Sequence, residues 1–303
     1  MNRRDFIKKS LILGGLTGAS FFINNNKNII AQSKQMPDLV AIKGGEPEIM
    51  FDNGIKVLGG MSQFIKKGQT VVIKPNIGWN RSVEYGANTH PKLVKRIIEH
   101  CKQAGAKKIY VFDHPCDHWE YTYKNSGIEK AAKDAGATVV PADTESYYQE
   151  VKIPKGKVLK KAKVHELIME SDVFINVPIL KHHSSTGLTI AMKNLMGAVW
   201  NRNFYHYSGL HQCITDFCTF KKPDLNIVDA YYVMLKYGPR GGSLEDVSNM
   251  KYQLISKDIV AIDAAAAKIF GANPEKVPYI KMGSDMRIGN MNLDKLNIKR
   301  LTI

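Results

Sequence analysis

The feature that most constrains the fold is a regular alternation of short apolar runs with longer helical periods. Strand-like runs rich in β-branched residues occur at 38–43, 70–76, 107–113, 138–142 and 172–180. Apolar residues at helical spacing lie between them, at 50–67, 91–104 and 128–135. Strands that alternate with helices in this way are typical of βαβ units and a parallel sheet.

Glycine and the later segments extend this pattern. Gly68, Gly105 and Gly136 each follow a helical period and precede a strand, which is where glycine commonly ends a helix. Alternating, charged residues near 147–163 predict a hairpin insertion. Further strands are expected at 225–232, 252–256 and 296–303, and a helix at 259–270. We predict a single α/β domain over 37–303: a doubly wound, mainly parallel sheet with helices on both faces and the small hairpin insertion.

The N-terminus has the layout of an export signal. Arg3 and Arg4 precede Phe6 and a weakly apolar stretch at 11–23, which is typical of the twin-arginine type. The stretch is shorter than the roughly twenty residues that span a bilayer. We predict a twin-arginine signal over 1–31, recognised by the twin-arginine export machinery, and a periplasmic or other extracytoplasmic location. Cleavage near 18–20, cleavage near Ala31 and an uncleaved membrane anchor all stay open.

The net positive charge narrows the classes of partner that the protein is expected to bind. The whole chain carries +15, and the mature chain +11, because five basic residues and one acidic residue leave with the signal. Such a balance suits nucleic acid, anionic lipid or acidic small molecules. Export and the lack of any nucleic-acid motif argue against nucleic acid. We therefore expect a small anionic ligand, with membrane contact only through the N-terminal signal.

The four cysteines do not form a scaffold or a familiar metal motif. They lack the C-x-x-C pairing of zinc and iron–sulfur sites. Cys213 and Cys218 are either a disulfide or two buried thiols.

Polar residues follow three of the predicted strands. Open parallel sheets bind ligands beyond the carboxyl ends of their strands, so these residues are expected to meet at one edge. They are Lys74 and Asn76, Asp113 and His114, and Lys181, His182 and His183. The cluster at 113–118 is either a metal or substrate site or a turn stiffened by Pro115.

Polar residues at three other places have either a functional or a purely structural role. Thr89 can cap the helix that Pro91 begins, so His90 either binds substrate or completes a helix start. His206 and His211 either form a lid over a ligand or belong to a packed loop. Asp229 and Asp263 lie among apolar residues; we favour function for Asp229 and structure for Asp263.

Lys193 is the strongest candidate for a reactive group. If a helix begins at Leu188, Lys193 lies on a largely apolar surface, where burial would lower its pKa and make the amine nucleophilic. Left charged, it would bind a carboxylate or phosphate. The alternative is a lysine that extends its ammonium to solvent. We predict that the side chains of Lys74, His183 and Lys193 surround one cavity.

The chain as a whole resembles a known family. The ordered motifs are Lys74-Pro75-Asn76, Thr89-His90-Pro91, Asp113, 172–178, Lys181-His182-His183, Lys193-Asn194-Leu195-Met196-Gly197, 223–230 and Ala261-Ile262-Asp263. They are similar to the family called domain of unknown function 362, in its twin-arginine-exported form. Some members carry a ferredoxin-like cysteine module that this sequence lacks, so no iron–sulfur cluster is expected.

A second resemblance covers only 172–197. It is similar to the nickel-pincer lactate racemase family, in which a lysine carries a pyridinium-derived cofactor and histidine binds nickel. The resemblance implies that Lys193 matches that lysine and His183 a catalytic histidine, with His206 or His211 near the metal ligand. Residues 189–192 replace most of the racemase's glycine-rich loop, which puts that cofactor in doubt.

Together these observations predict an exported enzyme that uses acid/base chemistry, or chemistry assisted by a metal ion or cofactor, on a small anionic substrate. The alternatives are a non-catalytic protein that binds a ligand, metal or partner during maturation, and a surface adhesion protein. The predicted roles are catalytic for Lys193, His183, His182 and Lys74; substrate-binding for Asn76, His90, Lys181, Asn194 and Asp229; and metal-binding for Asp113, His114, His206 and His211.

Overall fold

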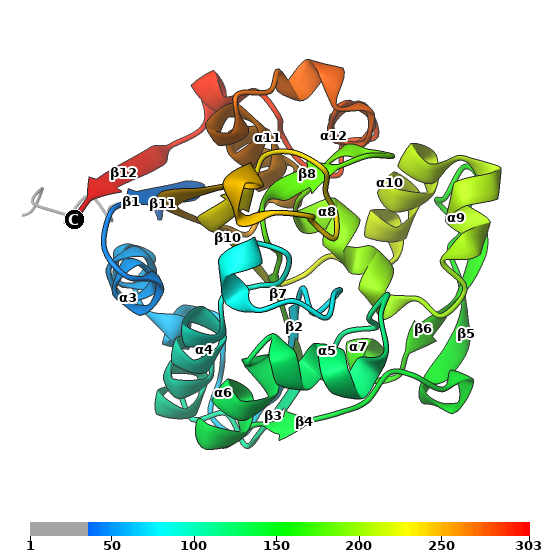
Figure 1. Ribbon diagram of the computed structural model, residues 1–303. Coiled ribbons are helices and arrows are strands. Elements are labelled where there is room, and N and C mark those ends of the chain that lie inside the picture. The colour runs from blue at the N-terminus through cyan, green and yellow to red at the C-terminus, as the bar shows by residue number, and fades with distance from the viewer. Residues whose placement is uncertain (1–35) are drawn as a thin grey trace, which may run out of the picture. The chain divides into compact units, whose positions relative to one another are not determined.

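The strands form a central sheet whose spatial order differs from their order along the chain (Figure 1). The computed structural model describes residues 36–303, so the predicted signal at 1–31 lies outside the described residues. The order across the sheet is β12-β1-β11-β10-β7-β2-β3-β4. The strands are β1 Leu39–Lys43, β2 Thr70–Pro75, β3 Lys108–Val111, β4 Thr138–Val139, β7 Val173–Val177, β10 Leu225–Met234, β11 Val247–Ser256 and β12 Ile298–Thr302.

Strand direction confirms a mainly parallel sheet. Only β11 runs antiparallel to its neighbours, β1 and β10, and every other pair in this sheet is parallel. A loop without an α-helix joins β10 to β11, and a connection of that kind returns the chain antiparallel.

Helices cover both faces of the sheet, as predicted (Figure 1). Strand alternation supplies the two apolar surfaces: Val71 and Ile73 pack toward α3, α4 and α6, while Val72 packs toward α8, α10, α11 and α12. The helices are α3 Pro47–Val57, α4 Pro91–Gln103, α5 Trp119–Asn125, α6 Ile128–Asp134, α7 Leu167–Glu170, α8 Ala191–Asn194, α9 Asn203–Ser208, α10 Leu210–Phe220, α11 Ile259–Phe270 and α12 Pro278–Asp285. Residues Pro37–Ile303 make one compact unit.

One predicted helix is shorter than expected, and another does not begin where it was predicted. The period at 50–67 gives a helix only as far as Val57, because Gly59 and Gly60 adopt left-handed backbone with φ of 85° and 86°. No helix begins at Leu188. Instead Gly187–Thr189 forms a strand, β9, which pairs antiparallel with β8, Lys181–His183. Lys193 therefore lies in the single turn of α8, directly after a hairpin.

The expected hairpin insertion is present as a separate two-stranded sheet. β5, Tyr148–Lys152, and β6, Lys161–His165, pair antiparallel. Cys213 and Cys218 are buried free thiols on α10, which agrees with the thiol alternative. Within residues 36–303, no helix is both long and apolar enough to cross a membrane.

Candidate functional site

The loops that leave the carboxyl ends of β2, β3 and β7 surround a cavity of about 400 Å³, called here the basic cavity. This is the edge of the sheet at which the sequence pattern predicts a site. Its polar lining residues are Asn76, Asp113, His114, Cys116, Lys181, His183, Ser184, Ser185, Thr189, Lys193, Asn194, Arg202, Asn203 and His206.

A buried ion pair lies beneath the basic cavity. Lys74 is fully buried, and its Nζ lies 2.7 Å from Asp113 Oδ1. Asp113 also accepts hydrogen bonds from the backbone N–H groups of Ile77, at 2.7 Å, and His114, at 3.0 Å. A Cβ on Gly197 would lie 1.9 Å from Asp113 Oδ1, so only glycine lets that backbone approach the pair. Since Asp113 is neutralised by Lys74, it leaves the other cations of the cavity uncompensated.

Three further cations line the basic cavity, and Asp113 is its one acidic lining residue. Lys181 is buried, and its Nζ donates to Ala87 O and, at 3.3 Å, to Asn76 Oδ1. Arg202 donates to the backbone oxygens of His114 and Pro115 at 2.9 and 2.7 Å. Neither cation has a carboxylate partner among the described residues.

Lys193 differs from these two because its amine has no hydrogen bond or ion pair with the described part of the chain. The side chain is half-buried. Burial lowers the pKa of Lys193 to about 8, and it lowers that of Lys181 to about 7. The amine of Lys193 is thus available to a ligand, whereas that of Lys181 is already held in place.

The two lining histidines with ring hydrogen bonds have defined protons. His183 Nδ1 accepts from the backbone N–H of Ser185 at 3.1 Å, so its proton is on Nε2. His114 Nδ1 lies 3.2 Å from Val199 O, an acceptor, so the proton is on Nδ1 and Nε2 keeps a lone pair. Burial lowers the pKa of His183 to about 2 and that of His114 to about 4. Neutral His183 is therefore a hydrogen-bond donor through Nε2.

A chain of four hydrogen-bonded asparagine amides connects the basic cavity to a backbone carbonyl of β11. Asn226 Nδ2 donates to Ser256 O at 3.5 Å, and its Oδ1 accepts from Asn176 at 3.0 Å. Asn176 Oδ1 accepts from Asn194, and Asn194 Oδ1 accepts from Asn76, both at 2.9 Å. Because the terminal carbonyl can only accept, every amide in the chain points the same way. Asn76 consequently presents Oδ1 to Lys181.

The sequence comparisons give the family. Residues 71–268, well over half of the chain, match the sequence profile of a family described as domain of unknown function (DUF362). The chain belongs to this family. This confirms the resemblance drawn from the ordered motifs. A thylakoid-associated protein of Synechocystis, sll1697, is 24% identical over 244 residues, which cover 78% of this chain and 73% of the relative.

Two solved structures are similar at low sequence identity. One is a Thermotoga maritima protein, with 12% identity, a TM-score of 0.46 and coverage of 80% of this chain and 60% of that one. The other is the lactate racemase apoprotein of Thermoanaerobacterium thermosaccharolyticum, with 13% identity, a TM-score of 0.44 and coverage of 70% and 53%. This DUF362 chain spans less than two thirds of the length of either structure.

Most of the residues predicted for the site meet at the basic cavity. Those that line it are Asn76, Asp113, His114, Lys181, His183, Lys193, Asn194 and His206. Lys74 does not line it; its ammonium pairs with the lining residue Asp113. The prediction of one shared cavity is thus confirmed for His183 and Lys193, whereas Lys74 lies behind Asp113. The chemical roles of these residues stay predictions.

Three predicted residues have structural contacts away from the basic cavity. His182 projects to the other side of β8 from His183, and its Nδ1 accepts from Gly238 N–H at 3.1 Å. His90 is the N-cap of α4, because its Nδ1 accepts from Lys92 N–H at 3.2 Å; this is the role expected of Thr89. Asp229 Oδ2 accepts from His90 N–H at 2.7 Å. Neither His90 nor Asp229 lines the basic cavity, so their predicted roles in substrate binding there are not supported.

The predicted metal ligands do not converge. Among residues 36–303, no three His, Cys, Asp or Glu side chains are placed to hold a metal ion. Asp113 is paired with Lys74, and His211 stacks on Tyr279 at 6.1 Å between ring centroids, outside the basic cavity. His206 lines the cavity but is exposed. The four side chains predicted as metal ligands therefore do not fit a metal ion among the described residues. No step of the chemistry proposed for the basic cavity depends on a metal ion.

Sequence patterns missed Arg202 and the inner asparagines of the amide chain. Arg202 lies in an aromatic segment with no strand before it, so the rule about strand ends does not select it. Asn176 and Asn226 lie within buried strands. A polar residue inside an apolar run must find a hydrogen-bond partner, and this pattern could have identified both of them.

Proposed function

We propose that the basic cavity binds a small anionic substrate. The observation that supports this is the cluster of Lys181, Lys193 and Arg202 around a cavity whose one acidic lining residue is already neutralised. Cations partly removed from water gain more from a bound carboxylate than exposed lysines do. A carboxylate placed among them would replace the solvation that burial removes.

We further propose acid/base catalysis with Lys193 as the base. With a pKa of about 8, about a tenth of the Lys193 amine is neutral at pH 7, which is enough for proton abstraction. A C–H bond next to a carbonyl or carboxylate breaks, its proton passes to Lys193 Nζ, and its electron pair moves onto the carbonyl oxygen. The Nε2–H of His183 stabilises that oxygen.

The test is hydrogen–deuterium exchange of small carboxylates in D₂O, followed by NMR, with binding measured in parallel by calorimetry. We expect α-proton exchange that accelerates with pH through about 8, as the amine loses its proton. Lys193→Met should reduce exchange by about 100-fold or more, within the range usual for loss of an acid/base group. The matched control is Lys92→Met, which changes an exposed lysine of α4.

The outcomes separate the candidate functions. Binding that depends on Lys193 without any exchange would favour the non-catalytic ligand-binding protein. Binding that is unchanged in Lys193→Met and Arg202→Met would overturn the basic cavity as the site.

We also propose that the protein works outside the cytoplasm, in association with a membrane or in an exported compartment. The twin-arginine pattern at residues 3–6 and the thylakoid-associated relative support this location.

A further inference from the structure

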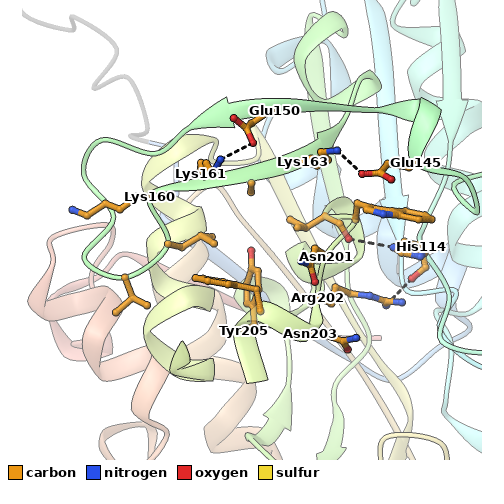
Figure 2. Close-up of a pocket in the computed structure, with 16 residues that line it drawn as sticks. His114, Glu145, Glu150, Lys160, Lys161, Lys163, Asn201, Arg202, Asn203 and Tyr205 are labelled. Carbon is orange, nitrogen blue, oxygen red and sulfur yellow. Dashed lines mark hydrogen bonds and ion pairs between the residues drawn. The ribbon is translucent and has the colours of Figure 1, made fainter. Parts of the chain in front are cut away.

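A second cavity of about 820 Å³ lies between the β5–β6 hairpin and α9; we call it the hairpin cavity (Figure 2). It shares His114, Arg202 and Asn203 with the basic cavity, so the two adjoin along these side chains. The hairpin cavity is about twice as large, and nothing in the chemistry proposed above uses it.

The charged groups of the hairpin cavity are already satisfied. Lys161 pairs with Glu150 at 3.1 Å, and Lys163 pairs with Glu145, as Figure 2 shows. Lys160 Nζ donates to Gly156 O at 2.7 Å. The cations of the basic cavity have no such acidic partners, so an anionic group is better accommodated there than here.

The rest of the lining is partly polar, with His114, Asn201, Arg202 and Asn203, and partly apolar. Val158, Leu159, Ala162, Val199 and Phe204 contribute hydrocarbon and aromatic surface.

Tyr205 also lines the hairpin cavity; its ring is fully buried, and its hydroxyl has no hydrogen-bond partner among the described residues (Figure 2). A buried hydroxyl without a partner loses its hydrogen bond to water and gains nothing in exchange, so native proteins rarely keep one.

We propose that the substrate is an extended amphiphilic anion: its carboxylate occupies the basic cavity and its apolar or aromatic body occupies the hairpin cavity. Arg202 lies at the junction, where its guanidinium borders both parts of the ligand. This inference rests on the proposed function, since it assigns the anionic end to the basic cavity. The β5–β6 hairpin then determines which substrates bind.

The test is calorimetric titration with phenylacetate, phenylbutyrate and phenylhexanoate, in which the charge is constant and the ring reaches progressively further. We expect phenylhexanoate to bind at least about tenfold more tightly than phenylacetate, because its ring enters an apolar cavity. Ala162→Trp fills the hairpin cavity and should abolish this gain while phenylacetate still binds. The matched control is Gln149→Trp, which adds the same ring to an exposed position of the hairpin outside the cavity.

A second variant covers the case in which Ala162→Trp does not fold. Phe204 is 40% exposed, so Phe204→Ala should be tolerated, and it should weaken phenylhexanoate binding several-fold without changing phenylacetate binding. Equal affinities along the series, or a gain that survives both variants, would overturn the second subsite and leave the proposed function intact. Phenylacetate binding that is unchanged in both Lys193→Met and Arg202→Met would overturn the proposed function and, with it, this inference.

Discussion

Replacing Lys74 by methionine tests whether the buried ion pair supports the fold rather than the chemistry. Methionine fills a similar volume but removes the ammonium 2.7 Å from Asp113, a carboxylate that is 2% exposed. Breaking a buried pair by removing one partner costs roughly 3–5 kcal/mol. The N–H groups of Ile77 and His114 still donate to Asp113, so we expect the lower end, about 3 kcal/mol.

The assay is urea unfolding of the wild type, Lys74→Met, Asp113→Asn and the double variant. Because the two side chains interact directly, the losses should not add, and the coupling energy should be about 2 kcal/mol or more. Lys92→Met is the control: its pair with Glu46 is exposed, and we expect a loss below about 1 kcal/mol. If the single losses add to within about 0.5 kcal/mol, the two side chains do not act as a pair and the reasoning fails.

Two further predictions concern acid stability and export. His165 is fully buried and its pKa is lowered to about 4, so the unfolded chain binds a proton between pH 6.5 and 4 that the folded chain does not. As pH falls across that window, His165 alone should lower the free energy of unfolding by about 3 kcal/mol, and His165→Phe should reduce the slope by about 1.4 kcal/mol per pH unit in urea unfolding; equal slopes would contradict this. Replacing both Arg3 and Arg4 by lysine should retain the protein in the cytoplasm on fractionation, and undiminished export would exclude the twin-arginine route.

The fold was largely predictable because its main signals are local. Period-two and period-3.6 patterns depend on which face of an element is buried, and they located the strands of the sheet. The antiparallel direction of β11 was not predicted, although no helical period separates the strands expected at 225–232 and 252–256, and a connection without a helix returns the chain antiparallel. The helix expected at Leu188 failed for a related reason: β9 exists because it pairs with β8, and its sequence also suits a helix.

The site was predictable where it follows a strand and not elsewhere. Asn76, Lys181 and His183 follow from the rule about the carboxyl ends of parallel strands. His182 satisfies the same rule, yet it bonds to a nearby backbone group, because a side chain's direction depends on its local turn. His90, predicted from a helix start, likewise bonds to backbone. Arg202 comes from a separate segment, and only tertiary packing brings it to the cavity.

Because the four asparagine amides all donate in the same direction, the group that Asn76 presents to the basic cavity is fixed as a hydrogen-bond acceptor. Reversing Asn76 alone would set two acceptor oxygens against each other at Asn194, so all four amides would have to turn together, and Asn226 would then face Ser256 O with an oxygen. A backbone carbonyl on β11 thereby dictates, from the antiparallel part of the sheet, that the cavity floor presents an acceptor to Lys181. A ligand meets a surface whose polarity was set during folding and needs no rearrangement when it arrives.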